Sequence, residues 1–133
     1  MHGLLTTQAH AVAILIPLVT DHASTLGGLL RFSGLSIVGS NLFSNVPFVM
    51  LIRTWIAGNP DASLLWLAVA ASSTFAGNLT LLGSVANLIV AQGAKDDCPL
   101  SFGAFLKVGI LTTIATVLIG AVAIAAYHLL RWV

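Results

Sequence analysis

An uncharged run from residue 62 to residue 94 is interrupted at its centre by the sequence Gly77-Asn78-Leu79-Thr80-Leu81-Leu82-Gly83-Ser84. Glycine weakens the interior of a helix, and Ser, Thr and Asn side chains compete for backbone hydrogen bonds. The pattern therefore predicts a discontinuous helix over 62–92, made of two half-helices joined by unwound backbone. At about 1.5 Å per residue, neither half is long enough to cross a hydrocarbon layer of ~30 Å alone.

The composition is that of an integral membrane protein. Of the 133 residues, 58% are hydrophobic and 7% are charged, whereas soluble domains carry roughly 25% charged residues. The mean hydropathy is +1.03. Five Lys and Arg residues against four Asp and Glu residues leave a net charge of +1. A soluble enzyme could not cover its surface with so few charges, and a nucleic-acid-binding protein would need a basic patch. Both classes are excluded.

The last uncharged run, residues 108–130, has the features of a plain membrane span. It is longer than the ~20 apolar residues that a crossing needs. Lys107 stands at one end, and Tyr127 and His128 form an interfacial anchor at the other. We predict one transmembrane helix over 102–130. The first part of the chain, 1–30, has only a short apolar stretch disturbed by Pro17, which favours an interfacial or peripheral helix.

A second interruption lies within the uncharged run 32–52, at Gly39-Ser40-Asn41-Leu42-Phe43-Ser44-Asn45-Val46-Pro47. Proline restricts the residue before it to extended conformations, yet it is favoured in the first turn of a new helix. We expect a re-entrant helical hairpin over 31–56. Its irregular tip would span residues 40–47, and its second helix would run from about Pro47 to Trp55. Arg31 and Arg53 would then lie on one side of the membrane.

The two interruptions together suggest a binding site at mid-depth in the membrane. Freed carbonyls and Ser, Asn and Thr oxygens can ligate a small cation, and half-helix N-termini near Pro47 and Ser84 can bind an anion. Irregular backbone at that depth must be buried in protein or line a cavity, so we expect the tip and the break to face each other. The candidate ion- or substrate-binding residues are Ser44, Asn45, Val46, Pro47, Gly77, Asn78, Thr80, Gly83, Ser84 and Asn87.

Helix packing is an alternative role for several of these residues. Ser36, Ser40 and Ser44 form a small-residue ladder that also suits close helix packing. The polar residues of the 77–84 stretch could equally form interhelical hydrogen bonds. No Asp or Glu falls within the predicted membrane segments, so a carboxylate proton relay is not expected in this part of the chain.

The motifs resemble those of the ion transporter superfamily, which includes arsenite efflux permeases, citrate and divalent-anion symporters, and a class of sodium/proton antiporters. Ser44-Asn45-Val46-Pro47 resembles their hairpin motif, and the stretch from Gly77 to Val90 resembles their second signature. The stretch from Leu100 to Gly109 is similar to the start of their last helix, and the resemblance spans roughly residues 33–132. One departure is Leu81, where many arsenite pumps have proline.

The resemblance implies a multi-pass protein of the cell membrane that carries out secondary transport of an inorganic or organic ion. It implies no enzymatic reaction and no cofactor beyond Na⁺ or H⁺ as the coupling ion, and any Na⁺ would bind at the residues already named. Superfamily members contain two inverted repeats, and residues 31–133 resemble the C-terminal one. We therefore expect a fragment or split subunit that works with the missing N-terminal repeat or with a second copy. The alternative is a non-transporting membrane subunit or a vestigial half of a carrier.

Overall fold

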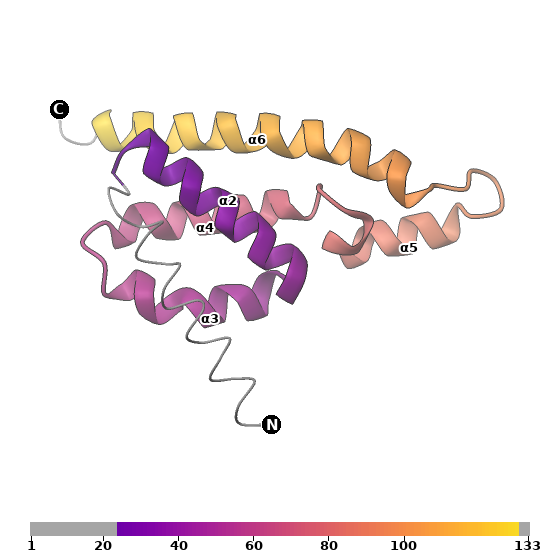
Figure 1. The fold of residues 1–133 in the computed structure, drawn as a ribbon, viewed down its shortest axis with the longest axis horizontal. Helices are drawn as coiled ribbons and strands as arrows, with labels where there is room; N and C mark the ends of the chain where they lie inside the picture. Colours follow the sequence, from indigo (N-terminus) through magenta and orange to yellow (C-terminus); the bar gives the residue numbers. More distant parts are fainter. Residues whose placement is uncertain (1–23, 131–133) are drawn as a thin grey trace, which may run out of the picture.

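The computed structural model describes residues 24–130, and the regular elements in this range are all helical (Figure 1). In chain order they are α2 (Leu26–Phe43), α3 (Asn45–Ala57), α4 (Ala62–Ala76), the short 3-10 helix η1 (Leu81–Gly83), α5 (Val85–Gly93) and α6 (Phe102–Leu130). An interfacial helix is expected over 1–30, and residues 1–23 of this range lie outside the described residues. Its last five residues belong to α2 instead.

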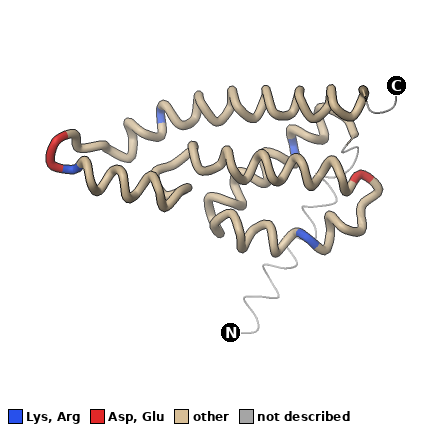
Figure 2. Tube along the Cα trace, turned by 180° about the vertical axis from the view of Figure 1, so that it is seen from behind, with Lys and Arg blue, Asp and Glu red and all other residues tan. Residues whose placement is uncertain are grey.

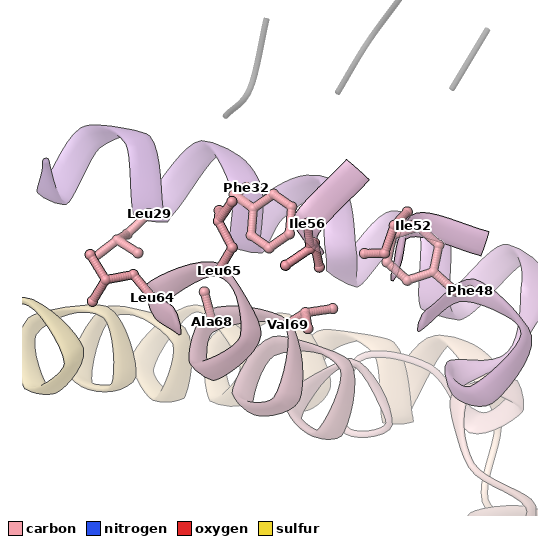
Figure 3. Packing of buried hydrophobic residues seen from close by; sticks show 9 residues of the cluster. All are labelled: Leu29, Phe32, Phe48, Ile52, Ile56, Leu64, Leu65, Ala68 and Val69. Atoms are coloured by element: carbon pink, nitrogen blue, oxygen red, sulfur yellow. The ribbon is translucent and has the colours of Figure 1, made fainter. Parts of the chain in front are cut away.

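A bundle of α2, α3, α4 and α6 forms the body of the molecule (Figure 1). Its hydrophobic core is formed by residues of α2, α3 and α4. Apolar residues four apart share a helix face, and α3 presents Phe48, Ile52 and Ile56 in this way. The buried cluster comprises Leu29, Phe32, Phe48, Ile52, Ile56, Leu64, Leu65, Ala68 and Val69 (Figure 3).

Helices α2 and α3 form a hairpin with a tip of a single residue. Ser44 has φ 70° and ψ 154°, a conformation that non-glycine residues rarely adopt. A Cβ atom on Gly39 would overlap the ring of Phe48, so the glycine lets the two helices pack closely. Figure 1 shows that the start of α2 and the end of α3 lie at the same end of the molecule as the C-terminal end of α6.

The prediction of an irregular tip over 40–47 is therefore wrong. Residues 40–43 complete α2, and Pro47 is the third residue of α3. The first turn of a helix has N–H groups without intrahelical partners, so the missing N–H of Pro47 costs nothing there. The hairpin also begins before residue 31, because the Thr25 hydroxyl accepts a hydrogen bond from Gly28 N (3.1 Å) and caps α2. Arg31 thus lies inside α2, where its side chain is exposed.

Helices α4 and α5 occupy the stretch for which the sequence predicts a discontinuous helix. After Ala76 the backbone tightens into i→i+3 hydrogen bonds, from Asn78 N to Phe75 O (3.0 Å) and from Leu79 N to Ala76 O (3.1 Å). The chain then passes through η1 and the extended residue Ser84 into α5. At about 1.5 Å per residue, α4 is about 22 Å long and α5 about 14 Å. No residue of α5 is buried, and α5 projects beyond the bundle (Figure 1).

Helix α6 has the predicted bounds, 102–130. Within the described part of the chain it is the one helix long and apolar enough to cross a membrane, with an 18-residue window of mean hydropathy 2.4. Only 17% of that window is buried, so most of its apolar surface faces outward. Within residues 24–130, the acidic residues lie in two connections at opposite ends of the molecule, the loop 94–101 and the α3–α4 connection (Figure 2).

Candidate functional site

The side chain of Asn41 ties the hairpin to the broken helix. Its Nδ2 donates hydrogen bonds to the carbonyl oxygens of Ile37 (3.0 Å) and Ala76 (3.0 Å). Its Oδ1 accepts a hydrogen bond from Thr80 Oγ1 (2.8 Å), across 39 positions in the sequence. One amide thus bridges the last turn of α2, the end of α4 and the unwound backbone that follows.

Glycines allow the chain to fold tightly around this bridge. A Cβ atom on Gly83 would lie 2.8 Å from Ala76 O and 2.9 Å from Asn41 Oδ1, closer than carbon and oxygen atoms can approach. Another amide closes the break from its far side, because Asn87 Nδ2 donates to Gly77 O at 2.7 Å. Asn41 and Asn87 thus donate to the carbonyl oxygens of Ala76 and Gly77. Ala76 O also accepts from Leu79 N, whereas Gly77 O keeps a second lone pair within the described residues.

Helix α6 packs directly on the break through Gly109. A Cβ atom on this residue would stand 2.5 Å from each of the carbonyl oxygens of Asn78 and Leu79. One turn further along α6, Thr113 is 3% exposed, and its hydroxyl has no hydrogen-bond partner within the described residues. The break is therefore enclosed between the end of α2 on one side and α6 on the other.

Three buried side-chain oxygens of these helices make no hydrogen bond within residues 24–130. They belong to Ser40, Asn45 and Thr113. The helix N-termini at Ser44 and Ser84 also lack a side-chain cap, which leaves backbone N–H groups of α3 and α5 free of such a partner. Both cation ligands and anion donors are thus present in this region.

The candidate residues differ in their burial and in their hydrogen bonds. It brings Gly77, Thr80, Gly83 and Asn87 into the hydrogen-bonded break around Asn41. At the tip, Ser44, Val46 and Pro47 are exposed, while Asn45 is half-buried. Asn78 is exposed, and Ser84 is half-buried at the start of α5.

Asn41 is not among the candidate residues predicted from the sequence, although it makes the contact between hairpin and break. The signal that could have found it is its place within the polar interruption 39–47, although Asn41 ends up in α2 and Asn45 in α3. No group of three or more His, Cys, Asp or Glu residues lies together in the described range. A cation here would be held by neutral oxygens, not by the nitrogen and sulfur ligands that transition metals prefer.

Curated proteins from three distant organisms are similar to the chain, whereas no family model and no solved structure matches it. It is 39% identical over 105 residues to transporter arsB of Dictyostelium discoideum, a match that covers 79% of this chain and 18% of that protein. It is 32% identical over 97 residues to the 46 kDa membrane protein of Mycobacterium leprae, covering 67% and 23%. It is 45% identical over 74 residues to the silicon efflux transporter LSI3 of Oryza sativa subsp. japonica, covering 51% and 15%.

The matched part of the chain spans less than a quarter of the length of each of these relatives. Two of them are named as transporters and the third as a membrane protein, and none as an enzyme. These names confirm the resemblance that the two motifs carry. Together with the length and hydropathy of α6, they identify the chain as a membrane protein.

Proposed function

We propose that this chain, a homologue of members of the ion transporter superfamily, forms one part of the ion-binding site of a membrane secondary transporter. The transporter would move an inorganic or organic ion, coupled to Na⁺ or H⁺. The observation that carries the proposal is the bridge from Asn41 to Ala76 O and Thr80, which joins the end of α2 to the break after α4. Discontinuous helices of this kind form the substrate sites of many secondary transporters.

In this proposal α6 crosses the bilayer, while the hairpin enters and leaves from the side where α6 ends. Helix α3, with 13 residues, is about 20 Å long and so is too short to cross ~30 Å of hydrocarbon. Helix α4 stops at the break after about 22 Å for the same reason. The tip and the break would then lie at mid-depth, where irregular backbone must be enclosed by protein or face water. The acidic connections at the two ends suit the two aqueous sides (Figure 2).

The bound ion would use oxygens that the fold leaves without a partner. Asn45 Oδ1 and Ser40 Oγ belong to the first residue of α3 and the last turn of α2, and the Thr80 hydroxyl keeps acceptor capacity beside Asn41. The uncapped N-termini of α3 and α5 would favour the negative charge of an anionic substrate. None of these groups is a carboxylate, so a coupling proton would be carried by another part of the transporter.

The remainder of the transporter would be the missing repeat or a second copy of this chain. Helix α5 buries none of its residues, and Val85, Ile89 and Val90 are more than half exposed. Such a surface suits a protein partner or lipid. The alternative function is that of a membrane subunit that packs against a carrier without transporting an ion itself. An exposed apolar helix suits that function as well.

The hairpin topology can be tested by cysteine accessibility. On a Cys98→Ser background, Ser24→Cys before α2 and Gly58→Cys after α3 should both react with an impermeant maleimide from one side of the membrane. In the parent chain, native Cys98, which is exposed in the loop 94–101, should react from the other side. Labelling of positions 24 and 58 from opposite sides would show that the α2–α3 segment crosses the membrane.

Replacing Asn45 with alanine should weaken ion binding roughly 10- to 100-fold. A hydrogen bond to a charged group contributes about 1.5–3 kcal/mol, and ~1.4 kcal/mol corresponds to a factor of ten in affinity. The measurement is the Na⁺ concentration that gives half of the Na⁺-dependent rise in melting temperature of the transporting assembly. Choline chloride would control for ionic strength.

Ser36→Ala is the matched control for this experiment. The Ser36 hydroxyl is buried on the same helix ladder, but it already donates to Phe32 O at 2.9 Å within α2. Its loss should leave the Na⁺ response unchanged. If Asn45→Ala responds to Na⁺ like the parent protein, Asn45 is a packing residue and the tip does not bind Na⁺.

A further inference from the structure

A groove lies away from the hairpin tip and the break. It has a volume of ≈ 740 Å³ and is bordered by the α3–α4 connection, the first turns of α4 and the last turn of α6. Its lining includes Asp61, Leu64, Trp66, Leu67 and Tyr127. Helix α4 separates it from the break by about 22 Å. Both of its walls lie at the end of the molecule where α6 finishes (Figure 1).

The carboxylate of Asp61 has an unusual position in this groove. Asp61 is the N-cap residue of α4, where an Asp side chain normally accepts a hydrogen bond from the first turn of the helix. Here the side chain makes no such bond. Among residues 24–130 it has no other hydrogen-bond or ion-pair partner, and the residue is half-buried. An unpaired carboxylate in a groove favours a cationic ligand.

Two aromatic rings add to this preference for a cation. Trp66 is 39% exposed and Tyr127 is 54% exposed, and both line the groove. Aromatic faces attract ammonium groups, and indole does so most strongly. Leu64 and Leu67 supply apolar surface beside the rings. Among the described lining residues, His128 is the one basic side chain, and none is Lys or Arg.

We propose that this groove binds the ammonium headgroup of a phospholipid, represented by phosphatidylethanolamine. The inference rests on the membrane placement of α6 proposed above, because the last turn of a spanning helix lies at the depth of the headgroups. Asp61 pairs with the ammonium group, and the rings of Trp66 and Tyr127 pack against it. The exposed hydroxyl of Ser63 is available to the phosphate, and an acyl chain lies along Leu67. A groove of this volume is within the range of small-molecule sites.

Native mass spectrometry of the chain released from lipid nanodiscs tests the proposal. The nanodiscs contain equal amounts of phosphatidylethanolamine and phosphatidylglycerol. The parent chain should retain phosphatidylethanolamine in excess over phosphatidylglycerol. Asp61→Asn should lower that ratio about tenfold, and Trp66→Leu about threefold, as expected for loss of an ion pair and of a cation–π contact.

Asp97→Asn is the control, since Asp97 is an exposed carboxylate in the loop 94–101 at the other end of the molecule. It should leave the ratio unchanged, and circular dichroism should give the same helix content for all variants. The proposal is overturned if the parent retains both lipids equally, retains none, or if Asp61→Asn keeps the parent's ratio. These results are separate from the Na⁺ response of Asn45→Ala, so either proposal can fail without the other.

Discussion

Replacing Asn41 with alanine is expected to lower the free energy of unfolding by about 2–4 kcal/mol. Its amide makes three hydrogen bonds, each of which contributes about 0.5–1.5 kcal/mol. Their loss also leaves the Ala76 carbonyl and the Thr80 hydroxyl without this partner inside the bundle. The measurement is unfolding by sodium dodecyl sulfate in phospholipid–detergent mixed micelles, followed by circular dichroism.

Thr80→Val is the matched variant for Asn41→Ala. It keeps the size of the side chain and removes only the 2.8 Å bond to Asn41 Oδ1. Its expected cost is about 1 kcal/mol, well below that of Asn41→Ala. Equal stability of Asn41→Ala and the parent would mean that the bridge between hairpin and break does not contribute to the fold.

Placing a methyl group on Gly109 is expected to push α6 away from the break. The new Cβ atom would meet two backbone carbonyl oxygens, those of Asn78 and Leu79, at 2.5 Å. Backbone atoms cannot move aside like the end of a flexible side chain, so Gly109→Ala should cost about 1–3 kcal/mol. Spin labels at the exposed positions Leu82 and Leu111 should report a longer distance in this variant.

Gly103→Ala provides the control on the same helix. A Cβ atom there would have no neighbour within 4 Å. Alanine is a better helix former than glycine, so this substitution should stabilise the protein by about 0.5–1 kcal/mol. If both glycine variants raise stability and the distance between the labels stays constant, the close packing of α6 on the break is not present in the membrane.

The sequence by itself determined the class of protein and the approximate places of its two interruptions, but not the exact ends of α2 and α3. Composition excludes a soluble fold, and the uncharged run between Lys107 and Arg131 predicts the C-terminal end of α6, which begins before that run at Phe102. The glycines at 77 and 83 and the proline at 47 marked the interruptions, because their effects on the backbone are local. The roles of Ser44, Asn45, Val46 and Pro47 in ion binding stay predictions.

Only the tertiary structure decided which residues join the interruptions. The Asn41 amide meets a hydroxyl 39 positions away, and no local pattern specifies that pairing. The tip is the single residue Ser44 and not the predicted stretch 40–47. Gly39 leaves room for the ring of Phe48 from the other helix, so both helices can continue up to the turn. Gly109 likewise acquires its importance from the carbonyls of a segment some thirty residues earlier. Propensity acts within a few residues along the chain, whereas these contacts depend on how close two distant backbones can approach.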